Sequence, residues 1–473
     1  MKLSPLQVLS VSEISQIHNA TLSILADCGV EIQHAEMLSF LEQRGLAVDR
    51  ELRRVRFSRS CVEEALSSVP SSFEVFDREG KHVFALGGGE SRIAAGHNAV
   101  FWVDSETGER RPSTVSDVEQ FARLCDQLEC IDMIGIPVMP QDVPDSKATL
   151  LHGVRAVMKN SRKPIFFSTD SAKVNGAVIH MAQAAFAGDF NRQAYAIGQL
   201  SPTSPLFWEH GVIQALMETV NMGVPLAILP EPIAGISAPY TLAGLITVNN
   251  AECLSGLVLT QLLKPGAKVL YANSWTTADM RTGAALVGST ETTICRIAGA
   301  QLARFYHVPS HTTAPNSDNH AHDEQNAWEK ALSTFCAMGA GNDLIVNCGM
   351  FATGMTCSHE QLIMDEEISA MSRRIAQGLR VSDETIASGL VKELGPHGQF
   401  LTAEHTVRHL RSDEYVSPRI SVRSPYATWK AEGSKDTYRL AQERVCECRK
   451  NPGSPLDRRR EQALAEIVGA FGS

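Results

Sequence analysis

Short, β-rich apolar segments that recur at a regular interval are the feature of this sequence that most restricts its fold. Seven such segments begin about 30 to 44 residues apart, and helical patterns separate most of them. Strand alternating with helix at this spacing is typical of βα units and predicts a parallel sheet. The seven segments are residues 131–139, 164–168, 194–200, 224–229, 268–272, 308–312 and 343–348. The helical patterns lie at residues 151–160, 172–187, 208–222, 241–263, 290–306 and 324–338.

An eighth strand would allow the sheet to close on itself, and the weaker apolar segment at residues 284–287 is the candidate for it. Eight units would complete a (β/α)8 barrel. The alternative is an open doubly wound sheet, which usually carries a glycine-rich phosphate turn after an early strand. The glycines at residues 87–89 instead follow a predicted hairpin of residues 73–76 and 82–86, which indicates a turn. The sequence therefore favours an α/β fold of the (β/α)8 barrel class.

The chain of 473 residues exceeds the size of one usual core, so we expect additions to the barrel. Residues 1–115 mix helical and strand patterns, and we interpret them as an N-terminal α+β cap or oligomerisation unit. The barrel and catalytic domain is predicted at residues 116–370, where Thr114 and Asp117 form a capping-box pattern at its first helix. Residues 371–473 are predicted to form a helical C-terminal extension that offers a packing or partner surface.

The charge balance argues against a nucleic-acid partner. The 43 Lys and Arg residues face 53 Asp and Glu residues, which gives a net charge of −10 without a strongly basic segment. The most apolar long stretch, residues 245–263, contains Asn249, Asn250 and Glu252, so it is interpreted as a buried helix and not as a membrane span. The 11 scattered cysteines and the lack of a signal-peptide pattern predict a cytoplasmic protein with reduced thiols.

Reacting groups of a barrel lie at the carboxyl ends of its strands, so residues after each predicted strand are the first site candidates. Glu231, Glu291 and Asp318 are the catalytic candidates, either as electrostatic partners of a cationic substrate or as carboxylates that hold a loop or a helix N-terminus. The strand ends are poor in lysine, which favours a cationic or neutral substrate over a phosphorylated one. The other polar strand-end residues are Gln141, Asp170, Ser201, Ser204, Asn273, Asn316, His320, His322 and Asn347.

A second group of residues suits the binding of an organic cation. Trp102, Trp275 and Phe351 are candidates for an aromatic wall, where cation–π attraction is worth about 0.5 to 2 kcal/mol per ring. Core packing is the alternative for each of them. His97 and Asn98 lie in a loop at the end of the first unit, where they fold over the barrel mouth or form a domain interface. The predicted substrate-binding set is His97, Asn98, Trp102, Trp275, Asn316, His320, Asn347 and Phe351.

A metal centre is the competing interpretation of the loop after residues 308–312. His320 and His322 form an H-x-H pair, and Cys348 or Cys357 with His359 would be further ligands. Barrel hydrolases carry such a pair on their first strand, whereas this pair follows a late one. We therefore predict no metal site. We also expect the cysteines in apolar surroundings to be unreactive.

A series of segments in consistent order, over about residues 10–380, points to a known family. The segments are 104–114 with Asp117, 231–235 through 241–244 to 250–252, 261–266, Ser317 and Asp318 with Asp323 and Gln325, 329–331, and 358–362 with Asp365 and Glu367. This series resembles the trimethylamine methyltransferase family.

The resemblance implies a (β/α)8 barrel and a reaction in which a methyl group passes from a methylated amine to the Co(I) form of a corrinoid on a separate protein. It implies that the chain holds no tightly bound cofactor and that a corrinoid protein supplies the cobalamin. Founding members place pyrrolysine in the barrel, and a branch that includes glycine betaine methyltransferase lacks it, as this chain does. The corresponding stretch lies within residues 316–322.

Two departures from the family lie on the loop expected to line the pocket. Asn319 and His320 stand where Ala-Lys is expected, and Asn326 and Ala327 stand where Ala-Gly is expected. The substrate is therefore expected to differ from those of known members.

We expect a quaternary amine such as glycine betaine, because it departs as a neutral tertiary amine without activation. A substrate carboxylate would need donors such as His97, His320, Asn316 or Asn347. A metal-dependent barrel hydrolase or lyase and a non-catalytic betaine-binding protein remain as alternatives, and a homo-oligomer is expected.

Overall fold

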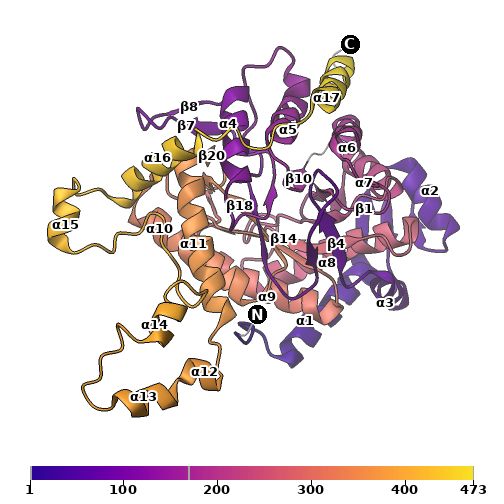
Figure 1. The fold of residues 1–473 in the computed structure, drawn as a ribbon. Helices are drawn as coiled ribbons and strands as arrows, with labels where there is room; N and C mark the ends of the chain where they lie inside the picture. Colours follow the sequence, from indigo (N-terminus) through magenta and orange to yellow (C-terminus); the bar gives the residue numbers. More distant parts are fainter. Residues whose placement is uncertain (1–2, 169–170, 472–473) are drawn as a thin grey trace.

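A closed barrel of eight parallel strands forms the centre of the computed structural model, which describes residues 3–168 and 171–471 (Figure 1). Each strand pairs in parallel with both of its neighbours, and the last strand in sequence pairs with the first. The predicted (β/α)8 barrel is confirmed. The barrel strands are β6 (Arg92–Ala95), β9 (Met133–Ile134), β10 (Ile165–Ser168), β11 (Ala196–Leu200), β13 (Leu226–Ile228), β14 (Val269–Asn273), β17 (Ser310–Thr313) and β18 (Leu344–Cys348).

A helix follows each barrel strand, which completes the alternation that the sequence predicted. The first of these helices begins at the predicted capping box, in which the side chains of Thr114 and Asp117 each bond the other residue's backbone N–H. The eight helices are α4 (Val115–Asp126), α5 (Thr149–Asn160), α6 (Ala172–Ala185), α7 (His210–Asn221), α8 (Leu242–Leu263), α9 (Thr290–Tyr306), α10 (Glu324–Gly339) and α11 (His359–Gln377). A short 3-10 helix, Ser146–Ala148, precedes α5.

The identity of the eighth strand was predicted wrongly. Residues 284–287 contain β16 (Ala285–Leu286), which pairs with β15 (Thr277–Ala278) in a separate two-stranded sheet. Both residues of β16 are only half-buried, which does not suit the wall of a barrel. The remaining strand is β6, which lies within the stretch assigned to the N-terminal unit. The barrel therefore begins before residue 116.

The N-terminal residues surround and close one end of the barrel. The hairpin of β4 (Phe73–Phe76) and β5 (His82–Leu86) was predicted, and its inward side chains join one apolar cluster with residues inside the barrel. Val75 of β4 bridges to Ala194, just before β11, so the hairpin closes the amino-terminal end. The other elements of this unit are α1 (Val11–Ser23), a π-helical turn (Ile24–Cys28), β1 (Val30–Ile32), α2 (Ala35–Gln43), β2 (Ala47–Asp49), β3 (Arg54–Arg56) and α3 (Arg59–Ser68).

Five further short strands, from the first unit and from the barrel loops, take part in small sheets. Strand β12 (Phe207–Trp208) extends the sheet of β1, β3 and β2. A second four-stranded sheet contains β19 (Met350–Phe351), β20 (Thr356–Cys357), β7 (Phe101–Val103) and β8 (Arg110–Pro112). The loops after β6 and β18 are therefore tied to one another at the carboxyl end of the barrel.

Helix α8 is the one helix of the described chain that is long and apolar enough to span a membrane, and 72% of its most apolar window is buried inside the protein. Two of the three polar residues noted in its sequence, Asn250 and Glu252, have partners in the core. Asn250 donates to Thr21 Oγ1 and to Tyr306 Oη at 2.8 Å each, and Glu252 accepts bonds from Ser204 and the Leu206 N–H. The predicted buried core helix is confirmed.

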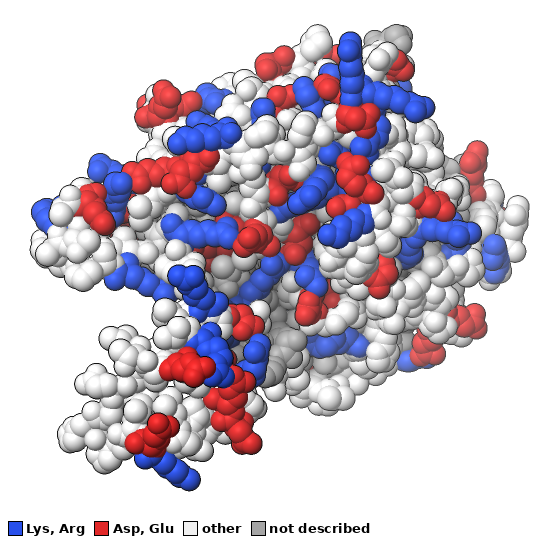
Figure 2. All heavy atoms as spheres, in the orientation of Figure 1, with Lys and Arg blue, Asp and Glu red and all other residues white. Residues whose placement is uncertain are grey.

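The C-terminal residues form an extension of short helices. Helix α16 (Thr437–Cys448) packs on α11, and α17 (Arg458–Phe471) packs on α6. The intervening helices are α12 (Asp383–Ile386), α13 (Ser388–Leu394), α14 (Glu404–His409) and α15 (Tyr426–Ala431), and none of them has a buried residue. They project from the body at the lower and far left in Figure 1. Figure 2 shows that acidic and basic side chains are interspersed on this face of the molecule.

Candidate active site

A cavity of about 620 Å³ lies at the carboxyl ends of the barrel strands. Strand-end residues from several strands line it, as expected for the mouth of a (β/α)8 barrel. Of the residues singled out from the sequence as catalytic or substrate-binding, five lie on its wall: His97, Asn98, Glu231, Asn316 and Asn347. His97 and Asn98 reach the cavity because they follow β6, which is a strand of the barrel and not part of a separate cap.

Glu231 is the one carboxylate among the described residues of the cavity wall. Its side chain is exposed to solvent in the cavity, and the walls of the barrel mouth around it reduce its hydration. This desolvation raises the pKa of Glu231 to about 7, although a hydrogen bond with Ser274 lowers the pKa in part. The group therefore titrates near neutral pH.

A chain of hydrogen bonds crosses the wall from β17 to β11. Asn316 Nδ2 lies 3.1 Å from the Thr313 carbonyl oxygen, and Asn347 Nδ2 lies 2.8 Å from Asn316 Oδ1. His97 Nδ1 lies 3.3 Å from Asn347 Oδ1, and its Nε2 lies 3.0 Å from Gln199 Nε2. Burial lowers the pKa of His97 to about 4, so its imidazole is neutral at physiological pH.

Two residues of the cavity wall, Asn347 and Asn98, have unusual backbone angles that set the direction of their side chains. Asn347 lies where the register of β18 against β6 shifts, between Val346 and Cys348, and its φ is 136°. Asn98 has a φ of 57°. Non-glycine residues rarely adopt such angles, and strain of this kind concentrates at functional sites.

Asp318 was predicted to be catalytic, but it lies behind the cavity and holds its loops together. Its carboxylate accepts bonds from the N–H groups of Val287 (2.9 Å) and Gly288 (3.0 Å) and from Thr353 Oγ1 (3.3 Å). Val287 and Thr353 themselves line the cavity. Burial raises the pKa of Asp318. Its geometry is that of a positioning residue.

Glu291 and the three predicted aromatic residues also lie outside the cavity wall. Glu291 is exposed in the first turn of α9, where its charge suits the helix N-terminus. Trp275 packs on Gly299 of α9, and Trp102 packs on the rings of Phe121 and His359.

Phe351 is buried against His322 and Val103. No Phe, Tyr or Trp is found among the described residues of the cavity wall. The expected aromatic wall is therefore not formed there, because burial of these large rings draws them into the packing layers around the barrel.

The two histidines of the H-x-H pair do not converge. His320 is exposed, whereas His322 Nε2 lies 3.0 Å from Ser358 Oγ and its ring contacts Phe351 and Tyr438. Within residues 3–168 and 171–471, no group of three or more His, Cys, Asp and Glu side chains is arranged to hold a metal ion. Asp170, another strand-end candidate, lies outside the described residues.

Three features in and around the cavity were not predicted from the sequence. Gln199 lies inside the apolar run of β11, and only the closed barrel shows that it lines the cavity. Arg296 is fully buried and donates to the carbonyl oxygens of Thr313 (2.6 Å) and Val287 (2.7 Å). Its burial lowers its pKa to about 10, so it keeps its charge.

The third missed element is a buried ion pair beneath the loops of the mouth. Lys330 Nζ lies 2.8 Å from Asp365 Oδ2, and neither side chain is exposed. The same carboxyl oxygen accepts a bond from the Gly349 N–H at 2.7 Å. The pair therefore joins α10 to α11 and to the loop that follows β18. Its signal in the sequence was its place in two of the family-like segments.

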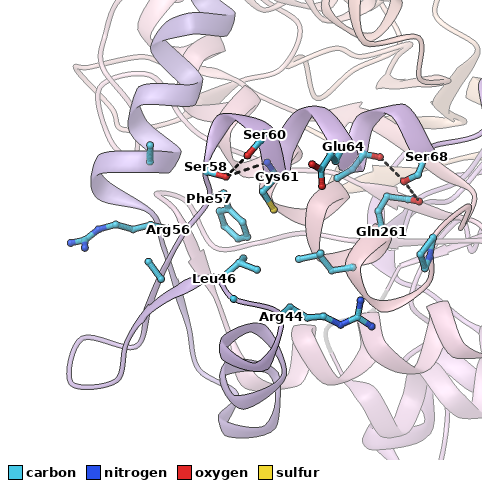
Figure 3. A pocket seen from close by; sticks show the side chains of 16 residues that line it. Arg44, Leu46, Arg56, Phe57, Ser58, Ser60, Cys61, Glu64, Ser68 and Gln261 are labelled. Carbon is cyan, nitrogen blue, oxygen red and sulfur yellow. Dashed lines mark hydrogen bonds between the residues drawn. The ribbon is translucent and has the colours of Figure 1, made fainter.

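A second cavity, of about 650 Å³, lies between the N-terminal unit and the end of α8 (Figure 3). Arg44, Arg56, Cys61 and Glu64 line it, with Gln261 from α8. Burial raises the pKa of Cys61, so its thiol is a poor nucleophile. Although this cavity is slightly larger, it is not built from strand ends. We assign the site to the barrel mouth.

The family described as trimethylamine methyltransferase (MTTB) matches residues 1–470. The trimethylamine methyltransferase of Desulfitobacterium hafniense is 31% identical over 462 residues, which cover 97% of this chain and 92% of that protein. A glycine betaine methyltransferase of the same species is 30% identical over 429 residues, which cover 90% and 88%.

Among solved structures, the monomethylamine methyltransferase of Methanosarcina barkeri has a similar fold, with a TM-score of 0.54 at 11% identity over 92% of this chain and 87% of that one. The fold, the cavity at the strand ends and the match over nearly the whole length agree. The chain belongs to the trimethylamine methyltransferase family.

Proposed function

We propose that this chain transfers a methyl group from a quaternary amine to the Co(I) corrinoid of a separate protein. The observation that carries the proposal is Glu231, a single carboxylate in a cavity whose described wall contains no lysine or arginine. Such a cavity suits one positive charge. The similarity to a glycine betaine methyltransferase and the lack of pyrrolysine in the sequence support a quaternary amine over trimethylamine.

In the proposed reaction, the corrinoid supplies a nucleophilic Co(I) that bonds to a methyl carbon of the substrate. The carbon–nitrogen bond breaks, and its electron pair stays on nitrogen, so the amine leaves neutral and the cobalt becomes methyl-Co(III). Glu231 balances the charge of the bound ammonium ion and loses this attraction once the amine is neutral. The product is therefore held more weakly than the substrate, which assists its release.

The remaining residues of the cavity hold the substrate in position. Met139, Leu150, Ile233 and Met350 give the wall apolar surface that fits methyl groups. Asp318 fixes the loops around them. Holding two reactants in line contributes about 7 to 11 kcal/mol to lowering a barrier of this type. In this proposal the chain orients the substrate and excludes water, and it carries no tightly bound cofactor of its own.

The corrinoid protein is proposed to dock at the barrel mouth, because its macrocycle must reach the methyl donor there. The loops that follow β14 and β17 border this end of the barrel. Co(I) survives only in a reducing environment, and the 11 free cysteines also suit the cytoplasm. We expect a homo-oligomer and no nucleic-acid partner.

The proposal is tested by exchanging carboxylates for amides of the same size. Glu231→Gln removes the charge that pairs with the ammonium ion, and kcat/KM for methyl transfer from a quaternary amine is expected to fall at least tenfold. Glu291→Gln is the matched control, because it removes a carboxylate that lies outside the cavity, and it is expected to retain near wild-type activity. Full activity of Glu231→Gln would place the site elsewhere. Binding without any transfer by the wild type would favour the non-catalytic alternative.

A further inference from the structure

The hydrogen bonds across the cavity wall run in one direction only. A backbone carbonyl oxygen can only accept, so Asn316 must present its NH2 group to Thr313. Its Oδ1 then accepts from the NH2 group of Asn347, which leaves Asn347 Oδ1 to face His97. An amide oxygen also only accepts. His97 Nδ1 therefore carries the proton of this hydrogen bond.

The direction continues through the imidazole to Gln199. Because burial holds the pKa of His97 at about 4, its Nε2 is an unprotonated acceptor at neutral pH. Gln199 must therefore present its NH2 group to His97, and this group also lies 3.4 Å from Ser168 Oγ. The four side chains orient one another, and each amide has one orientation that allows all of these hydrogen bonds to form.

This series of hydrogen bonds ends on an atom that has no partner among the described residues. Gln199 is 2% exposed and lines the cavity, and its Oε1 is buried without a hydrogen-bond donor. Leaving a buried acceptor unsatisfied is costly, and the residue that carries this one lines the cavity. A ligand that fills the cavity is favoured if it brings a donor to this oxygen.

The charges of the cavity exclude a second anion. A betaine would pair its ammonium group with Glu231 and leave its own carboxylate without a cation. Arg296 touches the wall from behind, but it is not among the residues that line the cavity, and each of its three nitrogens donates a bond, to Thr313, Thr293 and Val287. Residues 169–170, beside the cavity in sequence, are Thr-Asp and carry no positive charge. A carboxylate without a cationic partner is therefore less favourable in this cavity than a hydroxyl group, which carries no charge.

Resting on the proposed function, we infer that the substrate is a quaternary ammonium ion that carries a hydroxyl group, as choline does. Its ammonium group lies against Glu231, and its O–H donates to Gln199 Oε1. This substrate neutralises the cavity and satisfies its unpartnered acceptor at the same time. It differs from a betaine in both respects.

Calorimetric titration of the purified chain tests the inference without the corrinoid partner. The ligands are choline, propyltrimethylammonium, which replaces the hydroxyl by a methyl group, and glycine betaine. We expect choline to bind about tenfold more tightly than either of the others, since a site built for a hydroxyl rejects its apolar analogue. Gln199→Met keeps the length of the side chain without the acceptor, and it should bring the ratio of choline to propyltrimethylammonium affinity close to one. The side chain of Gln120 bonds Ser116 on α4 and does not line the cavity, so the control variant Gln120→Met should leave the ratio of choline to propyltrimethylammonium affinity unchanged.

Equal binding of choline and propyltrimethylammonium by the wild type, or tighter binding of glycine betaine, would overturn the inference. That comparison needs no variant, so it holds even if Gln199→Met does not fold. Methyl transfer from glycine betaine alone would likewise overturn the inference while the proposed function stands. The lack of transfer from every quaternary amine would instead defeat the proposed function, which is a separate readout.

Discussion

At the scale of single residues, the carboxyl group of Glu231 connects substrate binding to pH. Its pKa rises from 4.5 to about 7 because the folded protein desolvates it. Only the ionised form attracts a quaternary ammonium ion. The affinity for choline or glycine betaine is therefore expected to fall as the pH drops from 8 to 6. Calorimetric titration at several pH values measures this, and Glu231→Gln should bind weakly and without this pH dependence. A wild-type affinity that is constant over this range would contradict the assignment.

The raised pKa of Glu231 also affects the stability of the protein. A carboxyl group whose pKa is raised by folding stabilises the fold below its unfolded pKa, and this contribution is lost as the pH rises through about 7. Glu231→Gln should therefore gain stability relative to the wild type at pH 8 but not at pH 4.5. Urea unfolding of both proteins at the two pH values measures the difference. A variant that is less stable than the wild type at pH 8 would show that the carboxylate is stabilising.

At the scale of elements, the buried pair of Lys330 and Asp365 holds α10, α11 and the loop after β18 together. Lys330→Met leaves Asp365 buried without its cation, and the expected loss is about 3 to 5 kcal/mol in the free energy of unfolding. The double variant with Asp365→Leu should lose less than Lys330→Met alone, because no buried charge remains. Some loss should persist, since Asp365 also accepts from Gly349 and Gln361. Urea unfolding of the two single variants and the double variant tests this order.

The sequence was most informative where an element is long or fully apolar. The seven strands and the helices between them were predicted because each carries its own local pattern of burial. Strand β6 was missed because its four residues lie among glycines, and it is defined by pairing with β18 and β9, which are far away in sequence. Residues 284–287 have the right spacing for a strand but lie half-exposed in a loop.

The same reasoning explains which site residues were found. Glu231 and Asn316 follow recognisable strands and Asn347 lies near the end of one, so their place at the carboxyl ends could be predicted. Gln199 lies within a strand and looked like part of the core, and only the closure of the barrel places its side chain at the cavity wall. Trp275 also follows a strand, but nothing local in the sequence shows that its ring packs toward α9 and not into the mouth.

At the scale of the whole molecule, the barrel and the C-terminal extension differ in how well they are packed. Helices α12 to α15 have no buried residues, and apolar side chains such as Leu401 (81%) and Tyr415 (73%) are largely exposed. Segments with so few buried contacts open at low free energy. Limited trypsin digestion of the free chain should therefore cut within residues 380–435 first and leave the barrel intact. If the first cleavages occurred inside the barrel, this expected order would be contradicted.

We propose that the chain as a whole moves a methyl group from a quaternary amine to Co(I). The most direct measurement mixes the chain with a corrinoid protein reduced to Co(I) and a panel of methylated amines, and follows the absorbance change from Co(I) to methyl-Co(III). We expect this change with at least one quaternary amine of the panel and not with trimethylamine. Transfer from trimethylamine but from no quaternary amine would contradict it.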